Sequence, residues 1–284
     1  MRRERSQQMK RSTKRRILYG CLILLLAVLG YSLYRYLSIQ QEYRAERNAH
    51  EQLMKYRPAL PEPANPSGSV SEFAGNGNPD DPDPDQTEAP DDTIPITNGK
   101  IVQLKEDYPD AVGWITVPGT DVDYPFVQGK NNEYYLRRGI DGKYLYAGIP
   151  FLDYRCSPDF SGENTILFGH NLRNGSMFGT LTRFKEQNFF DNHRYFYVFL
   201  EHDIICAEII SCLVVTPNQA PYVFEPEIDS DFAERCVRDA RRSAAGLTFS
   251  ESDRFITLAT CDYERNNSRV ILIGRITESS ASPA

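Results

Sequence analysis

The sequence has few of the residues that mark a disulfide framework or a metal site. It contains 284 residues with six cysteines and four histidines, and no two cysteines are spaced as Cys-x-x-Cys. Zinc ribbons and thioredoxin-like redox motifs are therefore excluded. A domain as long as the globular part of this chain buries a core without covalent staples. We expect four of the cysteines to be small buried hydrophobic groups: Cys156, Cys206, Cys212 and Cys236.

Charge is absent from one long stretch and concentrated in two others. The formal net charge is −7, and residues 17–34 carry no charged side chain. Residues 1–16 hold eight basic side chains against one acid, whereas residues 79–92 hold seven acids and no cation. A basic segment directly before an apolar run is typical of a membrane topology signal, so we expect a membrane partner and no nucleic acid.

The apolar run predicts a single membrane span, because a bilayer needs about 17–25 apolar residues. The cationic flank predicts that residues 1–16 form a cytoplasmic basic tail and that the chain from about residue 38 lies outside the cell. A cleaved signal peptide is the alternative, but no small-x-small cleavage site follows the run. We therefore expect an uncleaved signal anchor at 17–37 in the cell membrane.

Two segments of different composition follow the anchor. Residues 38–57 are rich in helix formers and predict a helical stalk. Residues 58–97 are rich in Pro, Asp, Gly and Asn, and they predict a disordered linker because they cannot bury enough apolar surface to offset the entropy of ordering. Two prolines within the acidic run, and the lack of a glycine at the turn position, argue against a calcium-binding loop.

From residue 98 onward, short apolar stretches alternate with turn signals and predict one mostly-β domain at 98–284. A short helix is expected at 101–108, and a longer one at 230–245 that ends at Gly246. We find no internal repeat. The pattern predicts a mostly-β barrel with inserted helices. The expected strands include 165–168, 195–200, 204–215, 255–260 and 270–276.

Two strand ends carry side chains suited to nucleophilic catalysis. His170 follows the strand at 165–168, Cys261 ends the strand at 255–260, and Arg269 opens the next strand. If those last two strands form a hairpin, Arg269 lies beside Cys261, where a cation stabilises a thiolate and an oxyanion. Taken alone, each residue also fits a structural role, since a strand-end histidine is more often structural and a buried cysteine beside a surface arginine is common.

Taken together, the motifs resemble those of sortases. Thr-Leu-Ala-Thr-Cys at 257–261 followed by Arg269 is similar to the sortase Thr-Leu-x-Thr-Cys…Arg signature, and Phe-Gly-His-Asn at 168–171 is similar to the histidine segment. Three further segments resemble class B sortases, as does a helix before the cysteine strand. These segments are 113–115, 120–125 and 174–179. The resemblance covers residues 98–277, nearly all of the globular part.

The resemblance implies a closed eight-stranded β-barrel and a cysteine transpeptidase that needs no metal or cofactor. It implies that Cys261 attacks the threonine carbonyl of a sorting signal, that His170 transfers the protons and that Arg269 stabilises the oxyanion. The implied partners are a surface protein with a sorting signal and an amino group of a peptidoglycan precursor. Ala259, Thr260 and Asp262 are expected to line the substrate groove.

Some roles and alternatives stay open at this stage. Asp262, Glu264 or Asn171 could orient His170, although a solvated surface acid is the more common role for both acids. A hydrolytic cysteine peptidase has the same chemistry if water resolves the thioester, but the papain-like Cys-Gly-x-Cys-Trp motif is missing. A non-catalytic surface binding module on a stalk is the third possibility, and the joint placement of Cys, His and Arg at strand ends argues against it.

Overall fold

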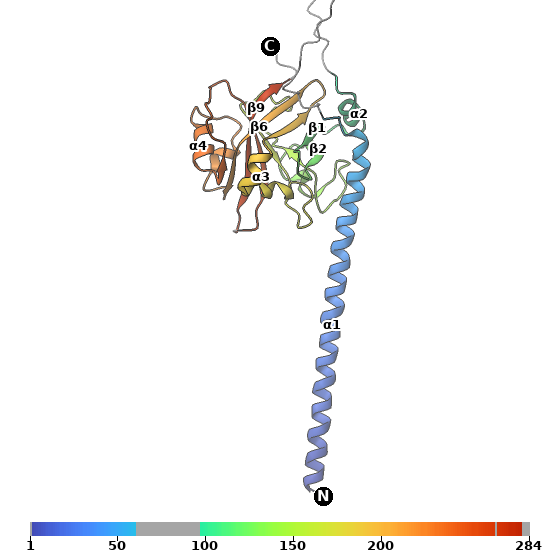
Figure 1. Cartoon of the computed structure of the whole chain (residues 1–284). Coiled ribbons are helices and arrows are strands. Elements are labelled where there is room, and N and C mark those ends of the chain that lie inside the picture. Colours follow the sequence, from blue (N-terminus) through green and yellow to red (C-terminus); the bar gives the residue numbers. More distant parts are fainter. Residues whose placement is uncertain (1, 61–96, 265, 280–284) are drawn as a thin grey trace, which may run out of the picture.

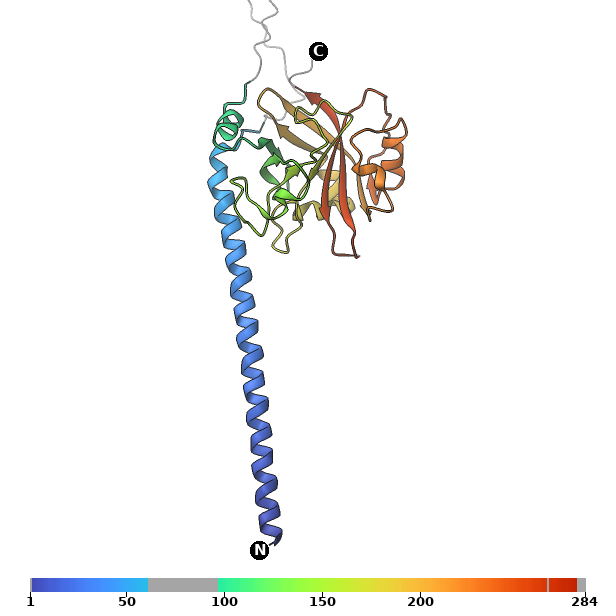
Figure 2. The ribbon, with the colours of Figure 1, turned by 180° about the vertical axis from the view of Figure 1, so that it is seen from behind.

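The computed structural model describes residues 2–60, 97–264 and 266–279 (Figure 1). A long N-terminal helix lies beside a β-rich domain over its C-terminal part, and the rest of the helix extends away from the domain (Figures 1 and 2). The linker predicted at 58–97 lies almost wholly outside the described residues.

The long helix, α1, runs without interruption from Arg2–Leu53 and continues into a 3-10 turn, η1, at Met54–Tyr56. Among the described residues it is the one helix long and apolar enough to cross a membrane, and the candidate span starts at Leu18. The large apolar side chains from Leu18 to Leu37 are exposed, so no other part of the described chain covers them. The segments predicted as anchor and stalk thus form a single helix.

Eight strands close into a barrel, as predicted. The ring order is β5-β1-β2-β3-β4-β8-β9-β6, and β6 pairs back with β5 to complete it. The two-residue strand β7 (Arg242–Ser243) pairs with β6 outside the ring. The ring strands are β1 (Ala111–Thr116), β2 (Asp123–Gln128), β3 (Phe151–Leu152), β4 (Asn164–Phe168), β5 (Tyr195–Phe199), β6 (Ile204–Val215), β8 (Phe255–Cys261) and β9 (Arg269–Ser279).

Short helical segments connect the strands. The α-helices of the domain are α2 (Gly99–Asp107), α3 (Gln187–Asn192) and α4 (Phe232–Arg238), and the 3-10 helices are η2 (Tyr134–Arg137), η3 (Gly179–Lys185) and η4 (Pro221–Phe224). The helix predicted at 101–108 is confirmed as α2. The strands predicted at 195–200 and 204–215 are confirmed, and they form a hairpin in which Phe199 pairs with Ile204.

Two layers of apolar side chains bury both faces of β8 and β9. Ile256, Leu258 and Leu272 belong to the cluster that fills the barrel interior, to which every ring strand contributes. Phe255, Ala259, Ile271 and Ile273 belong to a second cluster with Phe232 and Cys236 of α4. Because successive side chains of a strand point to opposite faces, β8 and β9 are apolar on both sides, unlike a strand with one solvated face.

The helix predicted at 230–245 is wrong in length, since α4 ends at Arg238. The chain then turns and pairs with β6: the amide of Arg241 donates to the Cys212 carbonyl and the amide of Ala244 donates to the Ile210 carbonyl, both at 2.9 Å. Pairing with an open strand edge thus overrides local helix propensity, which is only a weak determinant of structure.

Gly113 of β1 is a position where a side chain does not fit. A Cβ atom there would lie 2.4 Å from the Phe199 carbonyl oxygen of the neighbouring strand. We expect Gly113→Ala to destabilise the barrel by about 1–3 kcal/mol, because the strands must separate to accept the methyl group. Thermal unfolding of the full chain in detergent measures this as a Tm several degrees lower. Gly162→Ala is the control, since a Cβ at Gly162 meets no atom within 4 Å; equal Tm values for the two variants would contradict the packing argument.

Candidate active site

Three adjacent strands end at the same place with chemically active side chains. β4 and β8 run parallel with Phe168 opposite Ala259, so His170 and Cys261 each lie two residues beyond that pair. β8 and β9 run antiparallel with Cys261 directly opposite Arg269. The structure thus brings together His170, Cys261 and Arg269, which lie up to 99 positions apart in the sequence.

A cavity of about 220 Å³ opens at this end of the barrel, and all three residues line it. Most of the other lining side chains are apolar, and they include three phenylalanines from separate parts of the chain. The remaining lining residues are Asn132, Leu136, Phe151, Phe168, Gly169, Phe224, Ala259 and Thr260. Apolar walls exclude water and strengthen the interactions between a thiolate, an imidazolium and a guanidinium.

Cys261 is a half-buried free thiol at the last position of β8. Its backbone carbonyl accepts a hydrogen bond of 2.8 Å from the Asn171 side-chain amide. Asn171 is 8% exposed and directly follows His170, so this bond ties the histidine loop to the cysteine. Asn171 therefore positions the backbone of Cys261, and its side chain does not orient the His170 ring.

The His170 ring is held by a backbone carbonyl. Its Nε2 atom lies 2.7 Å from the Leu136 oxygen, and since a carbonyl only accepts, Nε2 carries a proton. In the neutral ring, Nδ1 is then the nitrogen that is free to accept a proton. Burial lowers the pKa of His170 below 6.5, the Leu136 hydrogen bond opposes this shift, and the charge of Arg137 adds to it. At neutral pH the neutral imidazole is therefore the major form.

Hydrogen bonds fix the exit from β4 relative to β8. The Gly169 amide donates to the Ala259 carbonyl at 3.1 Å, and the Thr260 hydroxyl donates to the Gly169 carbonyl at 2.7 Å. A Cβ on Gly169 would lie 2.4 Å from the buried ring of Phe178, so the chain approaches that ring closely just before His170. These contacts leave the histidine loop little freedom to move away from Cys261.

Of the three residues predicted to line the substrate groove, Ala259 and Thr260 line the cavity, and Asp262 does not. The Asp262 side chain is 2% exposed and accepts hydrogen bonds from Lys185 at 2.9 Å and from Ser268 at 3.2 Å. The expectation of a solvated acid at this position is wrong, because the Lys185 ammonium compensates the buried carboxylate. Glu264 is exposed and pairs with Lys185 and Arg241.

Sequence reasoning missed the loops that complete the cavity. Asn132 and Leu136 come from the segment around η2, and Phe224 ends η4. Leu136 acts on His170 through its backbone oxygen, which no residue type reveals. Among the described residues, no group of three or more His, Cys, Asp or Glu side chains is arranged to hold a metal ion.

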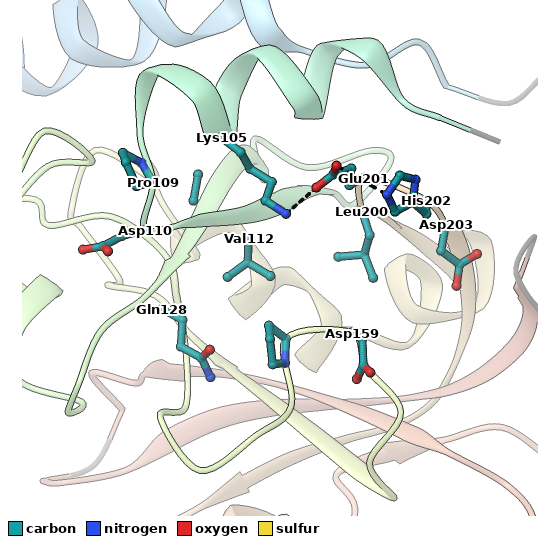
Figure 3. Close-up of a pocket in the computed structure, with 12 residues that line it drawn as sticks. Lys105, Pro109, Asp110, Val112, Gln128, Asp159, Leu200, Glu201, His202 and Asp203 are labelled. Carbon is teal, nitrogen blue, oxygen red and sulfur yellow. Dashed lines mark hydrogen bonds and ion pairs between the residues drawn. The ribbon is translucent and has the colours of Figure 1, made fainter. Parts of the chain in front are cut away.

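A second, wider hollow in the domain lies elsewhere (Figure 3). It measures about 520 Å³ and is lined by Lys105, Glu201 and His202 among others. Lys105 and Glu201 form an ion pair across it. β6 begins next to this hollow at Ile204 and ends at Val215, opposite Arg269. The two cavities therefore lie at opposite ends of the barrel, and Cys261 lines only the smaller of the two.

Comparisons with known proteins agree on one family. The model of the sortase domain family matches residues 115–277. Sortase B of Listeria monocytogenes is 33% identical over 173 residues, which are 59% of this chain and 70% of that protein. The structure of Clostridium perfringens sortase B matches with a TM-score of 0.59 and 27% identity, covering 62% of this chain and 99% of that one. A Staphylococcus aureus sortase B–substrate complex matches with a TM-score of 0.59 and 25% identity, covering 64% of this chain and 86% of that one.

The family match spans the barrel from β1 to β9 and includes the three residues that converge at the cavity. The relatives that match in sequence and in structure are sortase B proteins. The chain therefore belongs to the sortase family of cysteine transpeptidases and, within that family, to class B.

Proposed function

We propose that this protein cleaves the sorting signal of exported surface proteins after threonine and transfers the acyl group to an amino group of a peptidoglycan precursor. The observation that carries this proposal is the convergence of His170, Cys261 and Arg269 on one apolar cavity. A solved structure of Staphylococcus aureus sortase B contains a substrate, which supports a substrate-binding role for the corresponding barrel here.

In the first step, Nδ1 of His170 takes the proton of the Cys261 thiol, and the resulting thiolate attacks the threonine carbonyl carbon. A C–S bond forms, and the carbonyl π electrons move onto oxygen to give a tetrahedral oxyanion. Arg269 lies directly across the β8–β9 ladder from Cys261, so its guanidinium donates hydrogen bonds to that oxyanion. The apolar walls of the cavity raise the energetic value of this charge pairing.

In the second step, the intermediate collapses and the C–N bond to the next residue breaks. His170, as the imidazolium, gives its Nδ1 proton to the leaving amine while Nε2–H stays bonded to the Leu136 carbonyl. The acceptor amine then attacks the Cys261 thioester, Nδ1 takes one of its protons, and the thiolate leaves. The products are a new amide bond and a regenerated ion pair of Cys261 and His170.

The N-terminal helix provides the cellular setting in this proposal. α1 crosses the membrane once with the basic segment 1–16 in the cytoplasm, and the barrel lies outside the cell. The acceptor amine and the sorting signal are both available at the outer surface of the cell membrane, and α1 holds the barrel there.

A turnover assay tests the proposal on the full chain in detergent. With sorting-signal peptides and an added amine, we expect Cys261→Ala to abolish transfer and Arg269→Ala to lower kcat/KM by about 10²–10³ through the loss of an oxyanion donor. The controls are Cys206→Ala, which removes another half-buried thiol, and Arg238→Ala on the surface of α4. Product formation at the wild-type rate by the Cys261→Ala variant would contradict the mechanism. Product that does not increase with added amine would favour the hydrolytic peptidase.

The pH dependence of kcat/KM tests the role of His170. At low pH the His170 ring carries two protons and cannot take the proton of the Cys261 thiol, so activity requires that the ring lose a proton. Because burial lowers the pKa of His170, we expect the acidic limb of the profile below pH 6.5, with activity falling as the pH decreases through it.

Two neighbouring arginines, Arg137 and Arg138, provide a test variant and a control variant for the acidic limb of the pH profile. Its positive charge lowers the pKa of His170, so Arg137→Gln is expected to move the acidic limb to higher pH. Arg138→Gln, one residue further, is the control and leaves the limb in place. An acidic limb that moves equally in both variants, or in neither, would show that His170 does not set it.

A further inference from the structure

The C-terminal part of α1 is packed firmly against the catalytic domain. Leu53 and Tyr56 are 6% and 3% exposed and belong to a cluster with Trp114 and Ile101. One turn earlier, the His50 ring packs on Tyr124 with 4.3 Å between centroids. Glu46 is 5% exposed. The direction of the helix relative to the barrel is therefore fixed by packing.

The docked helix leads from the far side of the domain toward its catalytic end. Burial raises the pKa of Glu46, and hydrogen bonds with Ser176, Tyr124 and Asn174 oppose this shift, which places Glu46 beside the loop after His170. Ala45 and Glu46 of α1 also line one cavity together with Tyr144 and with Met177 of the same loop. In Figures 1 and 2 the tip of the β8–β9 hairpin points the same way as the N-terminal part of α1.

The distance from the catalytic end to the membrane follows from helix geometry. Ala45 of α1 lies level with Tyr144 and Met177, since all three line one cavity, and the last residue of the expected span is Leu37. Eight residues of α-helix measure about 12 Å at 1.5 Å per residue. The loops around Tyr144 and Met177 therefore lie close to the expected lipid headgroup layer.

The surface at this end has the chemistry of a membrane interface. Tyr144 and Tyr263 are 74% and 65% exposed. The guanidinium of Arg137 lies 4.5 Å from the ring of Tyr146, and that of Arg138 lies 4.4 Å from the ring of Tyr134. We call the following six residues the catalytic rim: Arg137, Arg138, Tyr144, Tyr146, Arg173 and Tyr263.

The charges of the rim are available to a partner. The described hydrogen bonds of Arg137 and Arg138 go to the Tyr146 and Tyr134 carbonyls, which carry no net charge. Arg173 is exposed. Tyrosine rings prefer the boundary between apolar and aqueous phases, and arginines near a membrane are attracted by anionic lipids.

We propose that the catalytic rim rests on the anionic headgroups of the membrane that α1 crosses, so that the active-site cavity opens at the lipid surface. This proposal rests on the anchoring by α1 and does not depend on the transpeptidation step. Its consequence is that substrates are taken from groups held at the bilayer surface, whereas groups displayed far above it do not reach Cys261.

Fluorescence quenching in vesicles tests this surface directly. The full chain is reconstituted in vesicles that contain phosphatidylglycerol and a lipid with a nitroxide on its headgroup. The single native tryptophan, Trp114, is fully buried and gives a constant background. We expect Tyr144→Trp to be quenched several-fold more strongly than His202→Trp, a control in the turn that precedes β6 at the opposite end of the barrel. Equal quenching at the two positions would overturn the proposal.

Two further sets of variants test the insertion of α1 and the contact with anionic lipid separately. Leu37→Trp lies at the end of the expected span and must be quenched if α1 is inserted; its failure would contradict the anchoring, independently of any activity. In the Tyr144→Trp background, the double change Arg138→Gln and Arg173→Gln is expected to reduce the quenching. The same reduction is expected in vesicles of phosphatidylcholine alone. Quenching that is unchanged in both would contradict contact with anionic lipid.

Discussion

The function depends on the register in which β8 pairs with both of its neighbours. Parallel pairing with β4 sets His170 level with Cys261, and antiparallel pairing with β9 sets Arg269 opposite it. A slip of one residue would turn the Cys261 side chain to the other face of the sheet, away from the cavity. The two apolar layers prevent this slip, because it would exchange the interior side chains of β8 with those that pack under α4.

The other features of the site depend on this pairing of β8 with β4 and β9. A closed barrel has no free edge at β8, so the strand ends cannot separate without breaking the ring. Short polar contacts then refine the positions, with Asn171 on the Cys261 carbonyl and Leu136 on the His170 ring. The apolar lining lowers the pKa of His170 through burial, and in the proposed mechanism it strengthens the pairing of Arg269 with the oxyanion. One arrangement thus supplies the geometry and the electrostatics.

Much of this site could be predicted from the sequence, because the signals are local. The strand of 255–260, the turn after it and the strand from 270 form a hairpin whose ends must meet, which places Arg269 beside Cys261. The position of His170 relative to Cys261 is harder to predict, because β4 and β8 become neighbours only when the barrel closes. Only the family resemblance linked these two segments. The sequence alone does not show which backbone carbonyl binds the His170 ring, because the oxygen of Leu136 is the same as that of any residue.

The errors also have physical causes. The helix at 230–245 was too long because the edge of β6 captures residues 241–244, a contact that local propensity does not contain. Asp262 was expected in solvent, but Lys185 from η3 lies close enough to compensate its charge in the interior. The composition of residues 38–57 indicated a helical stalk but not that its last turns complete an apolar cluster of the domain. In each case a partner distant in the sequence decided the outcome.

The acyl-enzyme intermediate gives the most direct test of the central claim. The full chain is incubated with a panel of sorting-signal peptides without an added amine, and its intact mass and its peptide map are measured. The account predicts a mass gain equal to the peptide through its threonine, located on Cys261 and released when an amine is added. An acyl group on any other of the six cysteines, or product that accumulates with no acyl group on the protein, would contradict it.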